Sequence, residues 1–265
     1  MRIESGTRAL ITGAGRGIGR ALAQALAQRG ATLGLMARSR AELDALAASL
    51  PGDHQVLVAD VAEADAVRAA VDGFAAAAGG LDLVVANAGL THYAPFAQQS
   101  LADALQMSQV NWHGTLFTVH AALPHLLRAG RGHVVIVSSG GGLRAFPSAA
   151  VYNGTKAAQR MFGDALRHEL ADTGVSVTVV YPGEIRTSLH DHEKATMPTW
   201  YQGGPKAAPP EKLAAKVIEG VEGDARAVYY PPFVRVLGML NGVSPRASDA
   251  LLRRLRGESV APRRD

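Results

Sequence analysis

The chain of 265 residues contains no cysteine. This absence excludes disulfide bonds, a thiolate nucleophile and zinc held by cysteines, and it is typical of cytoplasmic enzymes. Long apolar runs are also missing, because none reaches the ~20 residues that a membrane-spanning helix needs. The first residues lack the apolar core of a signal peptide. We therefore expect a cytoplasmic protein.

A large excess of charge of one sign is absent from most of the chain. The net charge is +4, and residues 246–265 alone contribute six arginines against three acidic residues. The remaining body is nearly neutral, and aromatic residues, only 5% of the chain, are not interleaved with the basic tail. Proteins that bind nucleic acid carry a broad basic surface. Nucleic acid is therefore not an expected partner.

Short apolar runs alternate along the chain with longer segments of helical periodicity. The runs have the length and composition of strands buried on both faces of a sheet. They span residues 8–12, 32–36, 55–59, 81–86, 133–138, 175–181 and 227–230. Apolar residues recur three and four positions apart, as in helices, over residues 17–29, 40–50, 62–78, 101–129, 149–173 and 210–221.

This alternation predicts an α/β fold of the Rossmann type. We expect a doubly wound, mostly parallel sheet of seven strands with helices on both faces, and ligands at the carboxyl ends of the strands. No linker divides the chain and 48% of its residues are hydrophobic, so residues 1–265 are expected to fold as one domain.

Two segments do not follow this alternation of strands and helices. Residues 187–209 contain Trp200 and Tyr201 among glycines and prolines, and we interpret them as a substrate lid. The alternative is a surface loop that these aromatic residues pin to the body. Residues 233–265 form a C-terminal extension, in which 233–240 and 245–256 are expected to be short helices.

A glycine-rich turn follows the first expected strand. Gly13, Gly17 and Gly19 leave room for backbone amides to approach a pyrophosphate at a helix N-terminus. Gly15, Arg16 and Ile18 stand between them, so the spacing is Thr-Gly-x-x-x-Gly-x-Gly and not Gly-x-Gly-x-x-Gly. The alternative is a glycine turn that holds no ligand.

The end of the second expected strand has no acidic residue. An enzyme that uses NAD usually presents an acid there to the ribose hydroxyls, whereas this chain has Arg38. Arg38 and Arg16 suit a 2'-phosphate, because charge-assisted hydrogen bonds contribute ~1.5 to 3 kcal/mol each. The sequence therefore predicts NADP(H), against the alternative that both arginines are solvated charges.

A tyrosine and a lysine four residues apart are the strongest chemical signal. On a helix that begins near Ala149, Tyr152 and Lys156 lie on one face, about one turn apart. Free tyrosine has a pKa of ~10, and proton transfer near neutral pH needs that value lowered by roughly 2 to 3 units. The lysine charge acts in that direction. Ser139 precedes Tyr152 by thirteen residues, at the end of a strand.

In order and spacing, these motifs resemble the short-chain dehydrogenase/reductase family, in its single-domain branch of ~250 residues. The resemblance covers residues 7–230. It rests on Thr12, Gly13, Gly17, Gly19, Asp60, Val61, Asn87, Ala88, Gly89, Asn111, Ser139, Tyr152, Lys156, Pro182, Gly183 and Thr187.

The resemblance implies a catalytic tetrad of Asn111, Ser139, Tyr152 and Lys156. Tyr152 would donate a proton to a substrate carbonyl that Ser139 holds, while the nicotinamide delivers hydride to the carbon. Lys156 would lower the pKa of Tyr152 and contact the nicotinamide ribose, and Asn111 would support a water that links the lysine to solvent. Ser138 is the weaker candidate for the serine.

The resemblance also implies the residues that bind the cofactor. Asn87, Ala88 and Gly89 would surround the adenosine, and Asp60 would meet the adenine edge. Thr187 would contact the carboxamide. The full set is Gly13, Gly15, Arg16, Gly17, Ile18, Gly19, Arg38, Asp60, Val61, Asn87, Ala88, Gly89, Tyr152, Lys156, Pro182, Gly183 and Thr187.

The expected function is an NADP(H)-dependent oxidoreductase of a hydrophobic ketone or aldehyde, or of the matching secondary alcohol. Two alternatives remain, an NADP-binding sensor or scaffold without turnover and a sugar-nucleotide epimerase or dehydratase. No metal is expected, although His190-Asp191-His192-Glu193 has the composition of a metal cluster.

Two further partners are expected from the sequence, a second copy of the chain and a membrane surface. A homo-oligomer is expected, but Val228-Tyr229-Tyr230-Pro231-Pro232 replaces the Val-Asp-Gly-Gly element with which many relatives close a tetramer. The C-terminal extension resembles that of relatives acting on lipid-like ketones, so its arginines favour a peripheral contact with an anionic membrane. The alternative is that its helices fold onto the body of the protein.

Overall fold

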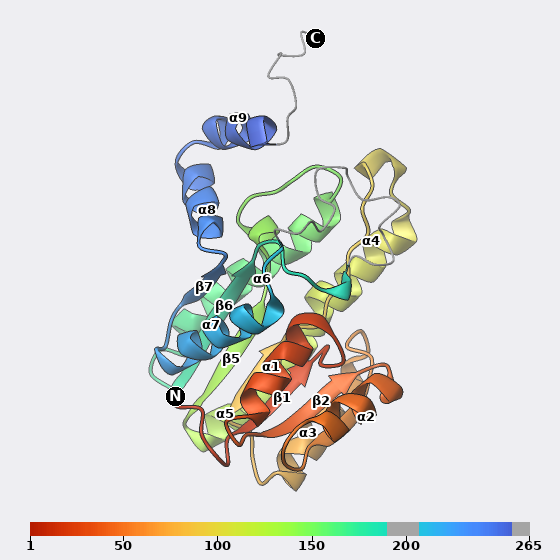
Figure 1. Cartoon of the computed structure of the whole chain (residues 1–265), viewed down its shortest axis with the longest axis vertical. Coiled ribbons are helices and arrows are strands. Elements are labelled where there is room, and N and C mark those ends of the chain that lie inside the picture. The colour runs from red at the N-terminus through yellow and green to blue at the C-terminus, as the bar shows by residue number, and fades with distance from the viewer. Residues whose placement is uncertain (190–206, 256–265) are drawn as a thin grey trace.

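A computed structural model describes residues 1–189 and 207–255 (Figure 1). Its centre is a seven-stranded sheet in the order β3-β2-β1-β4-β5-β6-β7, and every neighbouring pair is parallel. The strands are β1 (Arg8–Thr12), β2 (Thr32–Ala37), β3 (Gln55–Val58), β4 (Leu83–Ala86), β5 (Gly132–Val137), β6 (Val175–Pro182) and β7 (Ala227–Tyr230). The predicted Rossmann-type, doubly wound fold is confirmed.

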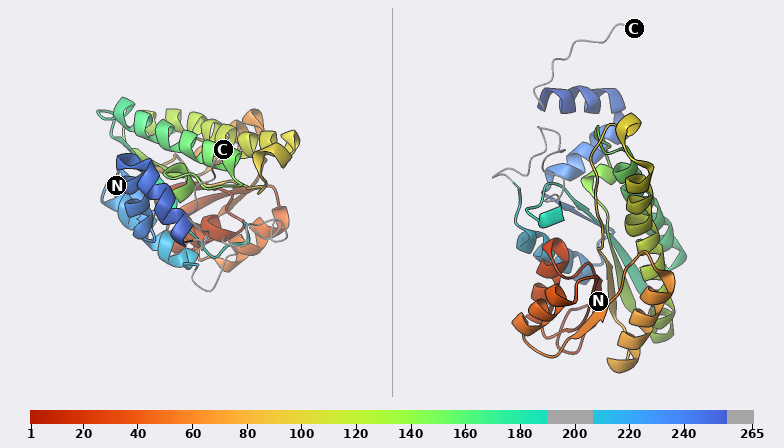
Figure 2. Two further views of the ribbon diagram at one scale, coloured as in Figure 1. Left: turned by 90° about the horizontal axis from the view of Figure 1, so that it is seen from above. Right: turned by 90° about the vertical axis from the view of Figure 1, so that its right-hand side faces the viewer.

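Helices cover both faces of the sheet, as Figure 2 shows. One face carries α1 (Gly17–Ala27), α2 (Arg40–Ser49) and α7 (Pro210–Glu222); the other carries α3 (Ala64–Ala77), α5 (Gly114–Ala129) and α6 (Ala150–Glu169). Neighbouring strand residues point to opposite faces, so Leu10 packs on α3 and α5 while Ile11 packs on α1 and α7. This double coverage explains why the strands are apolar without alternation.

The segment 101–129 is not the single helix expected from the sequence. It begins as α4 (Leu101–Met107), widens into the π-helix η2 (Ser108–His113) and continues as α5. In η2 the Asn111 carbonyl accepts hydrogen bonds from two side chains, Thr115 Oγ1 at 2.8 Å and Gln159 Nε2 at 2.8 Å. Two side-chain donors thus bond to the backbone where the helix widens, and π-helical turns of this kind are frequent at functional sites.

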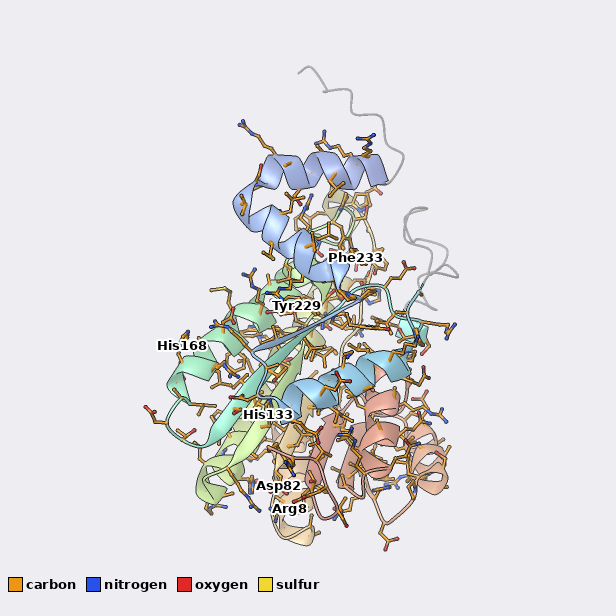
Figure 3. All side chains as sticks on the ribbon, turned by 60° about the vertical axis from the view of Figure 1, so that its left-hand side comes forward. Arg8, Asp82, His133, His168, Tyr229 and Phe233 are labelled. Atoms are coloured by element: carbon orange, nitrogen blue, oxygen red, sulfur yellow. The ribbon has the colours of Figure 1, made fainter. Side chains whose placement is uncertain are left out.

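The C-terminal extension forms α8 (Phe233–Val243) and α9 (Pro245–Leu255). Both lie beyond one end of the sheet, as Figures 1 and 3 show, far from Arg8 and Asp82 at the opposite end. The predicted extension is therefore helical, and α8 is three residues longer than expected. No helix in the described ranges is long and apolar enough to cross a membrane.

Candidate active site

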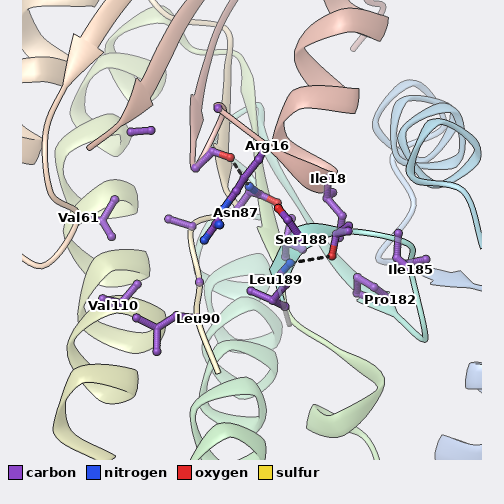
Figure 4. Close-up of a pocket in the computed structure, with 18 of the residues that line it drawn as sticks. Arg16, Ile18, Val61, Asn87, Leu90, Val110, Pro182, Ile185, Ser188 and Leu189 are labelled. Carbon is purple, nitrogen blue, oxygen red and sulfur yellow. Dashed lines mark hydrogen bonds between the residues drawn. The ribbon is translucent and has the colours of Figure 1, made fainter. Parts of the chain in front are cut away.

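A cleft of about 560 Å³ opens where the strands end at their carboxyl termini (Figure 4). It extends from the turn after β1 to Ser139 and Tyr152, so one cavity joins the expected nucleotide and catalytic residues. The residues expected from the sequence that line it are Gly13, Gly15, Arg16, Gly17, Ile18, Arg38, Asp60, Val61, Asn87, Ala88, Gly89, Ser139, Tyr152, Lys156, Pro182, Gly183 and Thr187. Gly19 and Asn111 are not among its lining residues.

The glycine turn has no room for side chains. Gly13 has φ +65°, and a Cβ there would lie 2.9 Å from the Ala88 Cα. A Cβ on Gly19 would lie 2.2 Å from the carbonyl oxygen of Gly13. Gly19 therefore lets α1 pack closely against the turn, while Gly17 and Ile18, the first two residues of α1, line the cleft. Such a cradle suits a pyrophosphate.

Asn87 joins the glycine turn to the end of β4. Its Nδ2 donates to the carbonyl oxygens of Thr12 at 2.9 Å and Gly13 at 3.3 Å. Thr12 Oγ1 in turn accepts from the amides of Asn87 at 3.0 Å and Ala88 at 3.1 Å. Asn87 thus holds the cradle in shape, which the sequence motif alone did not specify.

The two arginines expected to bind a 2'-phosphate both line the cleft. Arg38 Nη1 lies 3.8 Å from Asp60 Oδ2, and the Arg38 side chain is 64% exposed, so the guanidinium is free to accept a further anion. Glu42, which the sequence analysis missed, also lines the cleft, and its Oε2 would lie 2.7 Å from a Cβ on Gly15. Its place in the first turn after Ser39, the N-cap of α2, was the signal available in the sequence.

Ser139, Tyr152 and Lys156 meet at the inner end of the cleft. Ser139 and Tyr152 both line the cleft, Ser139 lowers the pKa of the Tyr152 phenol, and Ser139 Oγ accepts from the Gly141 amide at 3.0 Å. Lys156 Nζ lies 5.8 Å from the centre of the Tyr152 ring and donates to the Val137 carbonyl at 3.0 Å. The spacing of Tyr152 and Lys156 on one face of α6 is as expected.

Ser138 has a different partner. Its Oγ donates to the Lys156 carbonyl at 2.7 Å, and the residue is 3% exposed. This bond joins the end of β5 to α6. Because the Ser138 hydroxyl already donates its proton to the Lys156 carbonyl, that proton is not available to a substrate. The preference for Ser139 over Ser138 agrees with this geometry.

The pKa of Tyr152 moves opposite to the expectation from the sequence. Burial raises the pKa of Tyr152, and the hydrogen bond with Ser139 lowers it to a smaller extent. Burial also lowers the pKa of Lys156, to about 7. The spacing of Tyr152 and Lys156 indicates a lysine charge near the phenol, but spacing alone does not indicate that both groups lie in a desolvated site.

Asn111 does not line the cleft but is hydrogen-bonded to segments that do. Its side chain, fully buried, accepts from the Leu90 amide at 2.8 Å and donates to the Leu90 carbonyl at 3.0 Å and to Thr155 Oγ1 at 3.1 Å. These bonds join η2, the segment after β4 and α6. Gln159, which the sequence analysis missed, holds the Asn111 carbonyl and Thr115 Oγ1 through one amide group.

Aromatic side chains pack around the ring of Tyr152. The Phe146 ring lies 6.3 Å from that of Tyr152 and 6.5 Å from that of Tyr93. Leu90 and Met107 belong to the same apolar group. The ring of Tyr152 therefore packs in apolar surroundings, and Leu90 of this group also lines the cleft.

Two expectations fall mainly or wholly outside the described residues. The structure describes the expected lid only at residues 187–189 and 207–209. A backbone hydrogen bond joins these two stretches at their base, where the Arg186 amide donates to the Ala208 carbonyl at 2.9 Å. Thr187 and Ser188 line the cleft. Trp200, Tyr201 and the segment His190-Asp191-His192-Glu193 lie outside the described residues.

Comparison with known proteins gives relatives over most of the chain. A curated relative, an uncharacterised oxidoreductase of Staphylococcus aureus (strain MW2), is 36% identical over 182 residues, which cover 68% of this chain and 79% of that protein. The structure of a gluconate 5-dehydrogenase from Burkholderia cenocepacia J2315 with NADP and tartrate is 28% identical, with a TM-score of 0.78 over 89% of this chain and 98% of that chain.

A second structure is similar over the whole length. It is a short chain dehydrogenase/reductase from Burkholderia phymatum in complex with NAD, which is 23% identical with a TM-score of 0.85 and covers 100% of both chains. At this identity the similarity shows the fold alone. The model of the family described as short chain dehydrogenase matches residues 7–198. Because that match spans most of the chain and includes Ser139, Tyr152 and Lys156, the chain belongs to the short-chain dehydrogenase family of oxidoreductases.

Proposed function

We propose that the protein transfers hydride between NADP(H) and a hydrophobic ketone or aldehyde, or the matching secondary alcohol. The observation that carries this proposal is that Ser139, Tyr152 and Lys156 meet at one end of the cleft whose other end is the glycine turn. A hydroxyl pair and a lysine beside a nucleotide-shaped cavity suit proton transfer coupled to a redox cofactor.

The chain's own residues suit a nicotinamide dinucleotide. The amides at the start of α1 would hold the pyrophosphate, and the turn keeps the shape this needs because a Cβ on Gly13 or Gly19 would lie too close to neighbouring backbone. Arg16 and Arg38 would pair with a 2'-phosphate, and Asp60 with Val61 would border the adenine. Thr187 would meet the carboxamide and Lys156 the ribose. When bound, the cofactor supplies or accepts the hydride.

Tyr152 acts as the proton donor in reduction. Because burial raises its pKa, the phenol stays protonated near neutral pH, as an acid must before it donates. Ser139 donates its hydroxyl to the same carbonyl oxygen and holds the carbonyl in line. Lys156, with a pKa lowered to about 7, is able to release and regain a proton in the neutral range and so to supply Tyr152. Oxidation reverses these transfers.

The substrate class follows from the apolar surroundings of Tyr152. Phe146, Tyr93 and Met107 pack beside it, and Leu189 lines the cleft at the start of the expected lid. A substrate carbonyl next to Tyr152 would therefore carry an apolar group. We interpret residues 187–209 as the segment that covers it.

The experiment measures NADPH oxidation by the purified protein across a panel of hydrophobic ketones and aldehydes, beside Tyr152→Phe. A general acid contributes about 100- to 10,000-fold, so Tyr152→Phe should lose activity by that factor and keep NADPH binding. Tyr181→Phe is the matched control, because Tyr181 is also buried but stacks on Tyr229, outside the cleft lining. NADPH binding without turnover of any carbonyl or alcohol would instead indicate a sensor.

We also propose that the protein is a homo-oligomer. Met161 on α6 is 63% exposed, and the partly exposed rings of Trp112 and Phe162 pack edge to face beside it at 5.7 Å. A second copy would cover this apolar face. Light scattering after size exclusion tests this proposal, and Met161→Glu should lower the measured mass; a monomer in both proteins would contradict it.

A further inference from the structure

Val234 of α8 lies between the two loops that border the reacting end of the cleft. The residue is 3% exposed. A Cβ on Gly140, the residue after Ser139, would lie 3.3 Å from Val234 Cγ1, and one on Gly183 would lie 2.9 Å from Val234 Cγ2. The first turn of the C-terminal extension therefore contacts two loops. One runs from Ser139 to Phe146 and is called the serine loop below, and the other contains Pro182 and Gly183.

The next two turns of α8 contact Leu143 in the middle of the serine loop. Asn241 Nδ2 donates to the Leu143 carbonyl at 3.2 Å. Gly238 faces the same residue, because a Cβ there would lie 3.2 Å from the Leu143 Cβ. Polar and apolar contacts thus fix the same loop residue to α8.

Arg144 extends these contacts to α9. Its Nε donates to Ser248 Oγ at 2.8 Å, its Nη2 pairs with Asp249, and its Nη1 donates to the Ala145 carbonyl. The Arg144 side chain is only 15% exposed and Ser248 is 1% exposed. A partly buried arginine with several bonds is geometrically restrained and contributes more than a fully exposed ion pair.

The far side of the loop is held by α6. Asn153, the neighbour of Tyr152, donates from Nδ2 to the Phe146 carbonyl at 2.8 Å. The loop from Ser139 to Phe146 is thus held between the helix that carries Tyr152 and the helix pair α8–α9. Its first residue carries the proposed carbonyl-binding hydroxyl, and its last carries a ring of the apolar wall.

We propose that α8 and α9 are a positioning element of the active site, which acts through Arg144 and its partners Ser248 and Asp249. These bonds set where the Ser139 hydroxyl and the Phe146 ring lie relative to Tyr152. None of the three positioning residues needs to touch the substrate. The proposal rests on the proposed function, because it assigns α8–α9 a role in placing the groups that bind the carbonyl.

Substitutions on α9 test this role without altering the cleft. Ser248→Ala with Asp249→Ala removes both partners of Arg144 and keeps good helix formers. Misplacement of a catalytic group by ~1 Å costs up to about 100-fold, so we expect kcat to fall roughly 10-fold in the double variant. The Kd for NADPH should stay within about two-fold, since the glycine turn and Arg38 lie elsewhere.

Two comparisons separate positioning from stability. Arg226→Ala breaks the ion pair with Asp164, where Arg226 Nη2 lies 3.0 Å from Asp164 Oδ1, outside the serine loop, and should leave kcat unchanged. Arg144→Lys keeps the charge but loses the planar fork, and its kcat should lie between those of the parent and the double variant. The preference for bulky over small ketones should fall in the double variant, because Phe146 loses its fixed place. A folded double variant with the parent's kcat, KM and substrate preference would overturn the proposal.

Hydrogen exchange tests the same contacts without a substrate. The amides of Gly142, Leu143 and Arg144 are bonded to the carbonyls of Ser139 and Gly140 at 2.9, 3.0 and 3.0 Å. In the double variant these amides should exchange faster, while the amides of β1 stay unchanged. If the parent turns over no carbonyl, the proposed function fails; faster exchange then still supports the restraint by α9, and equal exchange overturns it.

Discussion

His133 Nε2 lies 2.7 Å from Thr178 Oγ1 across strands β5 and β6, and both residues are fully buried. Thr178 uses its own proton to donate to the Ala225 carbonyl at 2.6 Å, so it accepts from His133 Nε2–H. The other ring nitrogen, Nδ1, is buried and has no hydrogen-bond partner among the residues that the structure describes. The imidazole is therefore held neutral, with its lone pair at Nδ1 pointing into the interior.

We predict that this histidine makes the protein sensitive to acid. Burial lowers the pKa of His133 to about 4, below the ~6.5 of the unfolded chain, although nearby Asp224 acts in the opposite direction. The unfolded state thus binds the proton first, and the stability present above pH ~6.5 is lost as the pH falls toward 4. The loss is on the order of 3 kcal/mol.

Urea unfolding between pH 4 and 7 measures this effect. His133→Gln keeps a donor toward Thr178 but does not titrate, so its free energy of unfolding should fall less steeply between pH 6.5 and 4. His168→Gln is the control, because His168 is exposed on α6 (Figure 3) and should leave the slope unchanged. Equal slopes in the parent and His133→Gln would contradict the assignment.

We predict that Arg38 makes the protein prefer NADPH to NADH. Its guanidinium lines the cleft, and each charge-assisted hydrogen bond to a 2'-phosphate contributes ~1.5 to 3 kcal/mol. We expect Arg38→Ala to lower kcat/KM for NADPH by about 10- to 100-fold and to change kcat/KM for NADH little. Arg40→Ala is the matched control, since Arg40 is exposed but pairs with Asp44 and is not among the lining residues. A parent that prefers NADH would refute the NADP(H) proposal.

Gln159 should stabilise the fold and the tetrad together. The residue is 0% exposed, and its Nε2 donates to the Asn111 carbonyl at 2.8 Å and to Thr115 Oγ1 at 2.7 Å. Gln159→Met keeps the volume but removes the donor to Thr115 Oγ1 and one of the two donors to the Asn111 carbonyl, which keeps its bond from Thr115 Oγ1, so we expect a loss of about 1 to 3 kcal/mol and a lower kcat. Gln109→Met, at an exposed position of η2, should change neither. Calorimetry measures the stability of each variant, and steady-state kinetics measures its kcat. If Gln159→Met has the stability and the kcat of the parent, Gln159 does not stabilise the fold and the tetrad.

Helix α8 presents apolar side chains to solvent beside the basic residues of α9. Phe233, Val236, Met239 and Val243 are 53%, 62%, 62% and 87% exposed, and Arg253 and Arg254 are exposed on α9. We propose that this end contacts anionic lipid surfaces, because apolar and basic groups side by side suit a headgroup region.

Flotation with phosphatidylglycerol vesicles at low salt tests the membrane proposal. The parent should float, and Val236→Ser should weaken binding. Val58→Ser is a control of the same type, since Val58 is 47% exposed on β3, at the sheet edge opposite β7 and α8. An unbound parent would end the membrane proposal and leave the exposed face of α8 to a protein partner.

The sequence by itself determined the fold class and the cleft. Strand runs such as 8–12 are apolar without alternation, which only a sheet covered on both faces accommodates. Gly13 and Gly17 mark the turn because a positive φ and a close backbone approach exclude side chains there. Tyr152 and Lys156 share a helix face because the period of a helix places residues four apart together.

Only the tertiary structure decided how these groups behave. The spacing of Tyr152 and Lys156 indicates proximity, but their pKa values depend on burial, which many distant segments create together. Gln159 and Arg144 carry no motif, because their partners Asn111 and Ser248 lie 48 and 104 residues away in the chain. Long-range contacts of this kind arise from packing, and no local pattern in the sequence records them.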